Sequence, residues 1–364
     1  MKIEYIIQTL EEWTPLSYAE DFDNVGLLVG DKNRICSGAL ITHDVTVAVV
    51  EEAIASNCNL IICFHPIIFK GLSSITGKNY VEKTVLKAIE NKIAIYALHT
   101  ALDNHKKGIS YRLGELLDLQ QQYILIPQKN SLFHLTTYVP LNEKENVLAA
   151  LHEAGAGSIG DYSQCSFSIH GEGQFLPDEE STPAIGDQNI LTKLEETQLS
   201  VIVPKHTKNK VLKALSNTHP YETVAYELVA IENQHPDVGL GSIGQLKKPL
   251  PLNDFLMHVK QALSVDYIRH SETHLKEIKT VAVLGGSGSF SIDAAKAQGA
   301  DALITADLKY HDFFRGENTL LLVDAGHYET EQFTKRIIHE YLTKKIPNFA
   351  FTFSEENTNP VKYF

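Results

Sequence analysis

The 364-residue sequence has little cysteine and no long apolar run, and these absences exclude several classes of protein. Its four cysteines, Cys36, Cys58, Cys63 and Cys165, form no C-x-x-C pair and no disulfide framework, so we expect a reducing compartment. No stretch approaches the roughly eighteen apolar residues that a membrane helix needs. The first residues, MKIEYIIQTLEEW, lack the basic and long apolar regions of a secretory signal. A cytoplasmic protein without membrane contacts is therefore expected.

Positive charge is also scarce. The chain has 32 Lys and Arg against 45 Asp and Glu, which gives a formal net charge of −13. Phosphate backbones require a basic surface, so a nucleic-acid partner is unfavourable. A small polar substrate remains compatible with this charge, because a bound metal can supply local positive charge. The 43% hydrophobic content predicts a packed core.

The organisation of the chain changes twice. Residues 1–128 alternate helical and strand patterns, and the strand patterns include NLIICF and IAIYAL. This βαβ pattern predicts a mostly parallel sheet. A similar pattern resumes in residues 236–364, with strands TVAVLGG, DALITA and TLLLVDA and a last helix from about His327 to Lys345. The glycine-rich segment at about 236–248, DVGLGSIGQLKKP, is interpreted as a linker.

The middle segment, residues 129–235, contains an internal repeat. Residues 135–152 align without gaps to residues 199–216, and eight of the eighteen positions are identical. Each copy has the pattern of a strand, a proline and an amphipathic helix, and more strand-like sequence follows each copy. A repeated β-α-β unit predicts an inserted ferredoxin-like α+β domain. The fold class is thus a discontinuous, two-piece α/β metal-binding domain with this domain inserted.

Acid and imidazole side chains follow four of the strand-like runs. In open α/β sheets, ligands bind beyond the carboxyl ends of the strands, so four such ends suggest a metal site. The chain must bring its two ends together to build it. The residues concerned are His65; His99 and Asp103; Asp307 and His311; and His327 and Glu331.

Each residue alone also has a purely structural interpretation. His65 could be a core or loop histidine, and Asp103 and Asp307 could cap helices. Glu331 could form a solvated pair with Lys335. However, Glu331 stands four residues after His327 and shares a helical face with apolar residues further along, which favours an inward, metal-binding carboxylate.

Three other segments have alternatives. The loop in VAVLGGSGSF, with Gly285, Gly286 and Gly288, is either a tight strand-to-helix turn or an anion pocket. Residues 20–31, EDFDNVGLLVGD, resemble a calcium loop only loosely, so a structured turn is expected. Cys63 is expected to be an apolar side chain on a buried strand rather than a ligand.

Taken together, the motifs DFDNVGLLVGD, CFHPIIFKG, HTALDN, VLGGSGS, LITADLKYHD and DAGHYETE resemble the Nif-three-like family, whose bacterial members are called type 2 homologues of GTP cyclohydrolase I. The inserted segment is similar to that of the longer members, which carry a domain like the PII and CutA divalent-cation-tolerance proteins. The resemblance covers essentially the whole chain. It implies a dinuclear metal site and a homohexamer, with metal ligands at His65, Asp103, His327 and Glu331.

One departure from the family pattern matters. Many members have His-His-Pro where this chain has Phe64-His65-Pro66, and phenylalanine cannot coordinate a metal. One ion therefore loses a ligand, which water, His99 or another nearby group could replace.

A site of histidine and carboxylate suits one or two ions of Zn, Mn, Fe or Co per subunit. We expect Glu331 to bridge the ions, and His99, Asp307 and His311 to support the ligands or to act as acids and bases. The expected reaction is metal-assisted hydrolysis or ring opening of a small polar or nucleotide-like compound. The alternative is a metal-responsive ligand-binding or scaffold protein without turnover.

Overall fold

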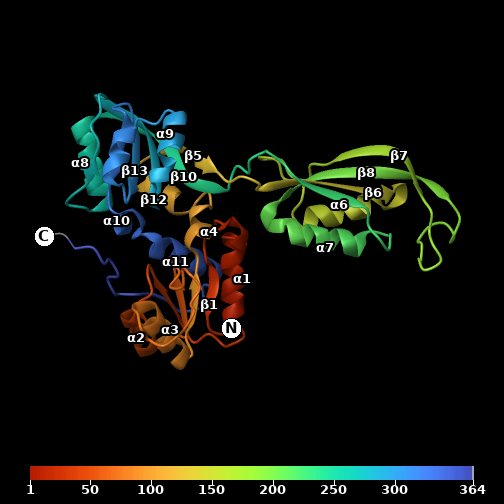
Figure 1. Ribbon diagram of the computed structural model, residues 1–364, viewed down its shortest axis with the longest axis horizontal. Coiled ribbons are helices and arrows are strands. Elements are labelled where there is room, and N and C mark those ends of the chain that lie inside the picture. The colour runs from red at the N-terminus through yellow and green to blue at the C-terminus, as the bar shows by residue number, and fades with distance from the viewer. Residues whose placement is uncertain (363–364) are drawn as a thin grey trace. The chain divides into compact units, whose positions relative to one another are not determined.

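The computed structural model describes residues 1–362 and divides the chain into two compact units (Figure 1). The outer unit comprises Met1–Pro127 and the segment from Asp237 onward, and the inserted unit comprises Gln128–Pro236. The bounds expected from the sequence differ from these by one residue. None of the helices in residues 1–362 is long and apolar enough to cross a membrane.

The outer unit contains a first sheet built mostly from the N-terminal piece, with strand order β1-β4-β3-β2-β15. β4, β3, β2 and β15 are parallel neighbours, whereas β1 is antiparallel to β4. Residues 20–31, expected to form only a structured turn, thus include a strand. The strands are β1 (Gly26–Val29), β2 (Ala39–Thr42), β3 (Leu60–Cys63), β4 (Ala94–Ala97) and β15 (Phe351–Phe353).

Helices cover both faces of the first sheet (Figure 1). Alternate strand residues explain this arrangement: Ile62 faces one core with α1 and α11, and Ile61 faces another with α2 and α3. Strand β15 and helix α11 come from the far end of the chain, so the two pieces share one core. These helices are α1 (Ile3–Trp13), α2 (Val47–Ala55), α3 (Tyr80–Glu90) and α11 (Thr334–Lys345).

The second sheet of the outer unit has strand order β11-β14-β13-β12-β10-β5. β12, β13 and β14 are parallel, and the remaining pairs are antiparallel. Helices α5 and α8 pack on one face, and α9 packs on the other. The elements are β5 (Gln120–Pro127), β10 (Gly239–Pro251), β11 (Arg269–His270), β12 (Glu277–Ser287), β13 (Ala302–Ala306), β14 (Leu321–Asp324), α5 (Ile109–Leu116), α8 (Leu252–Leu263) and α9 (Ile292–Ala297).

The interpretation of residues 236–248 as a linker is wrong. Most of the segment belongs to β10, which pairs with β12 on one side and β5 on the other. Its glycines obscured the strand pattern because they suggest loops. Ile243 is fully buried, and a Cβ on Gly239 would lie 2.3 Å from the Ile126 carbonyl oxygen, so close strand packing requires glycine there.

The inserted unit has the ferredoxin-like arrangement expected from the repeat. Its sheet has order β7-β8-β6-β9 with antiparallel pairs throughout, and α6 and α7 pack on one face. Repeat positions Val147 and Val211 both lie in the core. The elements are β6 (Leu132–Pro140), α6 (Lys144–Glu153), β7 (Phe167–Phe175), β8 (Thr192–Pro204), α7 (Lys208–Thr218) and β9 (Tyr226–Ala230).

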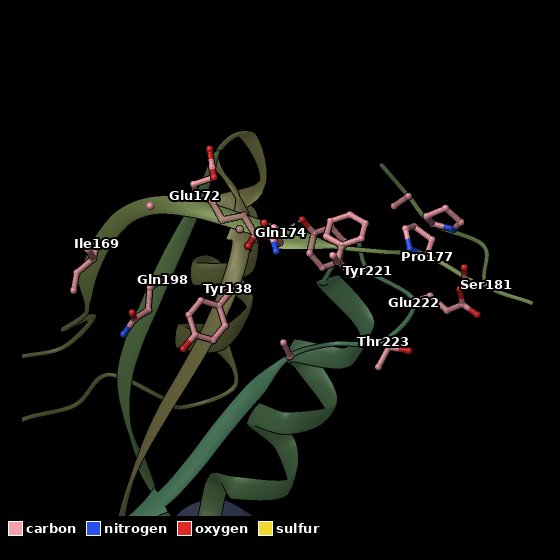
Figure 2. A pocket seen from close by; sticks show the side chains of 17 residues that line it. Tyr138, Ile169, Glu172, Gln174, Pro177, Ser181, Gln198, Tyr221, Glu222 and Thr223 are labelled. Carbon is pink, nitrogen blue, oxygen red and sulfur yellow. Dashed lines mark hydrogen bonds between the residues drawn. The ribbon is translucent and has the colours of Figure 1, made fainter. Parts of the chain in front are cut away.

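The inserted unit also contains a cavity of about 630 Å³ (Figure 2). Its wall includes Tyr138, Gln198 and Tyr221. The Tyr221 hydroxyl donates a hydrogen bond of 2.6 Å to Glu196, and burial together with this carboxylate raises the pKa of Tyr221. The cavity thus lies within a single unit, and its wall combines apolar side chains with the carboxylate of Glu196.

Candidate metal centre

The carboxyl ends of strands from both sheets of the outer unit carry the polar side chains of the candidate site. In the first sheet, His43 follows β2, His65 follows β3, and His99 begins α4 (His99–Asp103) directly after β4. In the second sheet, Asp307 follows β13 and α10 (His327–Glu331) follows β14. The two chain pieces therefore meet at this place, as the sequence predicted.

Glu331 is the centre of the cluster. Its side chain is 4% exposed, and its Oε2 atom has no hydrogen-bond partner. The Nε2 atoms of three histidines surround that oxygen, at 3.3 Å for His327, 3.4 Å for His65 and 3.5 Å for His43. Two ligand atoms bound to one tetrahedral zinc ion at about 2.0–2.2 Å lie roughly 3.3–3.6 Å apart. The observed separations fit ligands that share a cation better than they fit short hydrogen bonds.

The helix that carries Glu331 is shorter than expected. The sequence predicted one helix from about His327 to Lys345, but α10 ends at Glu331 and α11 begins at Thr334. The Thr334 hydroxyl donates to the Glu331 carbonyl at this break. α10 packs on β12 and β13 of the second sheet, whereas α11 packs on β2 and β15 of the first. Because of the break, α10 packs on the second sheet and α11 packs on the first, and Glu331 lies where the two helices meet.

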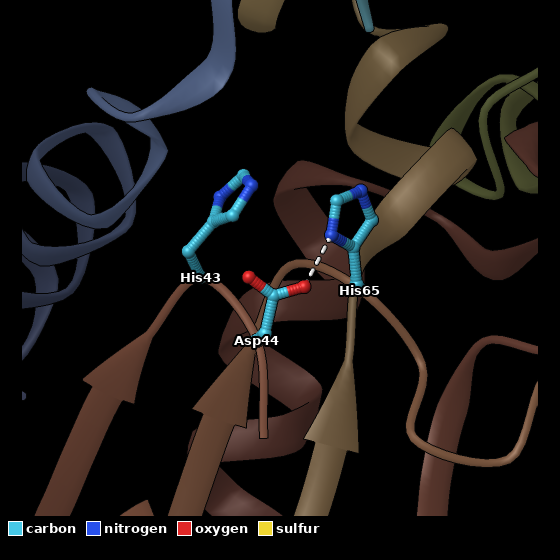
Figure 3. Close-up of side chains that lie close together, drawn as sticks. All are labelled: His43, Asp44 and His65. Carbon is cyan, nitrogen blue, oxygen red and sulfur yellow. Dashed lines mark hydrogen bonds and ion pairs between the residues drawn. The ribbon is translucent and has the colours of Figure 1, made fainter. Parts of the chain in front are cut away.

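A carboxylate orients each of three histidines through its Nδ1 atom. Asp44 contacts His65 at 2.8 Å (Figure 3), Asp23 contacts His99 at 2.8 Å, and Asp307 contacts His327 at 2.7 Å. Such a contact fixes the ring and leaves Nε2 to bind a metal, which is the usual support for metal-ligating histidines.

The sequence analysis assigned Asp307 such a supporting role but missed Asp23 and Asp44. Asp23 lies in the segment that was expected to be only a structured turn. Its side chain is fully buried, and it also accepts hydrogen bonds from the Thr100 backbone and hydroxyl.

The carboxylates and imidazoles of the cluster shift one another's pKa values, and these shifts favour protonated imidazoles. Burial tends to lower the pKa of His65, but the hydrogen bond to Asp44 and the negative charge of Glu331, whose Oε2 lies 3.4 Å from His65 Nε2, outweigh burial and raise that pKa to about 9. For His327, Asp307 and Glu331 likewise outweigh burial and raise the pKa to about 10. Burial would raise the pKa of Glu331, yet the imidazoles hold it well below its usual range. A cation entering the cluster must displace these protons.

Asp103 lies near the cluster rather than within its tightest part. Two groups of at least three residues have potential ligand atoms within 4.8 Å of one another among residues 1–362. The first contains His65, His327 and Glu331, the second contains His43, Asp44 and His65, and Asp103 is in neither.

Asp103 nevertheless lines a cavity of about 370 Å³ together with His99, His327 and Glu331. Burial and the charge of Glu331 raise its pKa well above the usual value, and this repulsion between carboxylates is what a cation would relieve. A second cavity, of about 540 Å³, reaches His43, His65 and His327 as well.

Two further expectations concern residues beside the cluster. His311 is exposed, its ring lies 5.2 Å from that of Tyr310, and it lines neither cavity at the cluster. A supporting or acid–base role for His311 therefore has no geometric basis. Cys63 is fully buried in the core of the first sheet, as expected of an apolar strand residue.

Two glycines expected in a loop, Gly285 and Gly286, instead lie at the end of β12 (Glu277–Ser287), beside Glu331. The Gly286 amide donates to the Thr330 hydroxyl, and Gly286 has φ +65°. A Cβ there would lie 2.3 Å from Glu331 Oε1 and 3.1 Å from His327 Nε2. Gly286 thus leaves space for the side chains of Glu331 and His327.

Comparison with known proteins decides the family. The model of the Duf34/NIF3 (NGG1p interacting factor 3) family matches residues 1–360. The chain belongs to the NIF3 family. A Bacillus subtilis relative named "GTP cyclohydrolase 1 type 2 homolog" is 36% identical over 99% of this chain and 98% of its own length. A Halalkalibacterium halodurans protein of the same name is 38% identical over 93% of this chain and 91% of its own length.

NIF3 relatives of known structure share the whole fold. The crystal structure of a Bacillus cereus protein related to NIF3 is 36% identical and has a TM-score of 0.83, covering 100% of this chain and 99% of that one. A Staphylococcus aureus structure is 28% identical with a TM-score of 0.78 over the same shares. The mixed α/β fold of the NIF3 type and a candidate His/Glu cluster for metal are thus established for this chain.

Substitution Gly286→Ala tests the space beside Glu331. We expect zinc affinity to fall by at least about tenfold, because the new methyl group displaces the carboxylate. Gly299→Ala is the matched control, since Gly299 also has a positive φ of +71° but open space around its Cβ position. Competition with a chromophoric chelator measures both affinities. Equal losses in the two variants would contradict the steric account.

Substitution Asp307→Asn tests the orientation of His327. The amide keeps the shape of the carboxylate but loses its charge, so zinc affinity should fall by about 10–100-fold. His311→Ala should leave the affinity unchanged, because this exposed side chain does not reach the cluster. Equilibrium dialysis followed by elemental analysis compares the two variants. A loss in His311→Ala, with none in Asp307→Asn, would reverse these assignments.

Proposed function

We propose that this protein binds divalent metal ions at the cluster around Glu331 and hydrolyses a small polar or nucleotide-like substrate there. The observation that supports the proposal most strongly is the buried Glu331 oxygen, which has three imidazole nitrogens at 3.3–3.5 Å and no hydrogen bond. A buried charge of this kind needs a compensating partner. The protein would satisfy it with a cation in the active state.

The proposed ligands are His65, Asp103, His327 and Glu331. Their mixture of nitrogen and oxygen donors suits Zn, Mn, Fe or Co, whereas Ca prefers oxygen alone. Glu331 would bridge two cations, since its Oε2 atom faces imidazoles from both sheets. Lewis-acid activation of water and of the scissile bond is the chemistry that such cations supply.

The two cavities at the cluster support a substrate of modest size. The 370 Å³ cavity is lined by polar groups and by the rings of Phe22 and Phe290, whose side chains are well exposed. Such rings offer faces on which a base could stack. The 540 Å³ cavity includes the Arg269 guanidinium, which is paired with Asp324, so the bound cations would supply most of the attraction for an anionic group there. This combination favours a nucleotide-like compound.

Two residues beside the cluster would support catalysis, one by moving protons and one by orienting a ligand. His99 lines the smaller cavity, and Asp23 holds its Nδ1, so its Nε2 would exchange a proton with substrate or water. Asp307 would act through His327, whose ring it orients. His99 adopts φ +30°, an unusual conformation for a non-glycine residue, and such strain is common at functional sites.

Substitution Glu331→Gln tests the proposed function. The amide cannot supply the negative charge, so bound metal per subunit should fall to a small fraction of the wild-type value, and hydrolysis should be lost with it. The assay measures metal content by elemental analysis and turnover of a panel of nucleotides, including GTP, and phosphoesters with Mn or Zn. Unchanged metal content and unchanged turnover in Glu331→Gln would refute the proposal.

A second candidate function is a metal-responsive ligand-binding or scaffold protein. The 630 Å³ cavity of the inserted unit favours it, because that unit could bind a small ligand of its own. Phe64 favours it as well, since it removes one ligand from the metal site. Ligands that raise the melting temperature without any turnover of the same panel would support this function.

We also propose that the chain assembles as a homohexamer, as the family resemblance implies. Exposed apolar side chains on the inserted sheet, Phe167, Ile169 and Val229, supply surface for contacts between copies. Native mass spectrometry of the full chain should give six times the mass of 40.5 kDa. A monomer at micromolar concentration would exclude this assembly.

A further inference from the structure

Phe64 leaves a gap in the metal cluster that its own strand cannot fill. The side chain is fully buried in the core that contains Ile41 and Ile62. It follows β3 directly, and its ring lies 4.9 Å from that of His65. A phenyl ring at this place packs against the cluster but offers no ligand atom.

His43 occupies the equivalent position on the neighbouring strand. In the parallel pair β2–β3, Ile41 lies beside Ile62 and Thr42 lies beside Cys63. One residue further, this register sets His43 beside Phe64. The two rings stack with centroids 5.5 Å apart and an interplanar angle of 26°. Side chains at neighbouring register positions share a sheet face, so an imidazole at either position reaches the same region.

The His43 imidazole is buried and has no hydrogen bond. The residue is 2% exposed, and neither Nδ1 nor Nε2 has a partner. The rings of Phe64 and Tyr328 flank it, and His65 lies 4.7 Å away between centroids. Leaving a buried polar group without a partner destabilises the folded protein, so a side chain of this kind needs a reason to be there.

The position of His43 relative to the Glu331 carboxylate indicates why a buried imidazole is present here. His43 Nε2 lies 3.5 Å from Glu331 Oε2, at the same separation, within 0.2 Å, as the Nε2 atoms of His65 and His327. Figure 3 shows the His43 ring beside His65 and Asp44, just beyond the ends of β2 and β3. His43, Asp44 and His65 also form one of the two groups with ligand atoms within 4.8 Å.

We infer that His43 is a metal ligand, which supplies from β2 the imidazole that Phe64 cannot supply from β3, so that the centre retains two cation positions. The inference rests on the proposed metal-binding function. In this chain the imidazole stands after β2, at His43, instead of after β3, at position 64. Both positions lie on the same face of the sheet.

His99 is the competing replacement. Its ring lies 5.6 Å from that of Phe64, and it lines the 370 Å³ cavity. However, Asp23 already satisfies His99 Nδ1, and residues 1–362 contain no ion pair between His99 and Glu331. His43 alone of the two combines contact with Glu331 and an unsatisfied buried ring. His43 is therefore the better ligand.

The experiment moves the imidazole between the two strands. The variants are His43→Leu, Phe64→His, the double variant His43→Leu/Phe64→His, and His99→Leu. The matched control is His339→Leu, which makes the same change at a half-buried histidine on α11. Each full-length protein is loaded with zinc, and elemental analysis gives zinc per subunit. A competing chelator gives the affinities, and X-ray absorption spectroscopy counts the imidazoles bound per zinc.

Wild type and His339→Leu should bind two zinc ions per subunit. In His43→Leu the second ion should bind at least about tenfold more weakly, with a lower imidazole count, and the double variant should recover it. If His43→Leu does not fold, as circular dichroism would show, His43→Gln is used instead and should lose the same ion.

Two zinc ions in His43→Leu with wild-type affinity, or a loss in His99→Leu alone, would overturn the inference while the metal-binding function stands. Wild-type protein that binds no zinc would overturn the proposed function itself.

Discussion

The buried carboxylate of Glu331 is the constraint on which the outer unit depends. It is 4% exposed, lies on the short helix α10, and is surrounded by His43 and His65 from the first sheet and by His327 from α10 itself. Leaving one partner of a buried ion pair unmatched costs about 3–5 kcal/mol. His65 and His327 therefore do more than line a cavity. The neighbouring carboxylates raise the pKa values of both imidazoles, which favours positive charge beside Glu331.

This constraint explains why one domain is made from two distant pieces of the chain. The first sheet supplies His43, His65 and His99, and the second supplies Asp307, His327 and Gly286. Neither sheet alone places the imidazoles of His43, His65 and His327 around Glu331. Strand β15 pairs with β2, and α11 packs in the core of the first sheet, although both come from the C-terminal piece. These contacts join the two pieces of the outer unit. The site residues therefore follow directly from strands and helices that are packed on one another.

Much of the fold was predictable because its signals are local. Apolar runs such as LIIC gave strands, 3.6-residue periodicity gave α1 and α3, and the repeat gave the inserted ferredoxin-like unit. Strand β10 was missed because its glycines, which permit close strand packing, are indistinguishable from loop glycines in sequence. The break between α10 and α11 was missed because periodicity continues through it, and only packing on two different sheets reveals it.

The site was predictable to the extent that its residues follow strands. His65, His99, Asp103, His327 and Glu331 all reach the cluster or its cavity, whereas His311, only four residues after Asp307, turns into the solvent on the segment Tyr310–Gly316. Asp23 and Asp44 were missed because their partners lie 76 and 21 residues away. His43 was visible in the sequence, but its role depends on the register of β2 with β3, which no local pattern encodes.

The account depends on a cation at Glu331, and the most direct test is anomalous scattering at the zinc edge from crystals of the full chain grown with zinc. The account predicts an anomalous peak within coordination distance of Glu331 and of the Nε2 atoms that face it. Well-ordered crystals whose zinc peaks lie only elsewhere, with Glu331 and the three imidazoles free of metal, would contradict it.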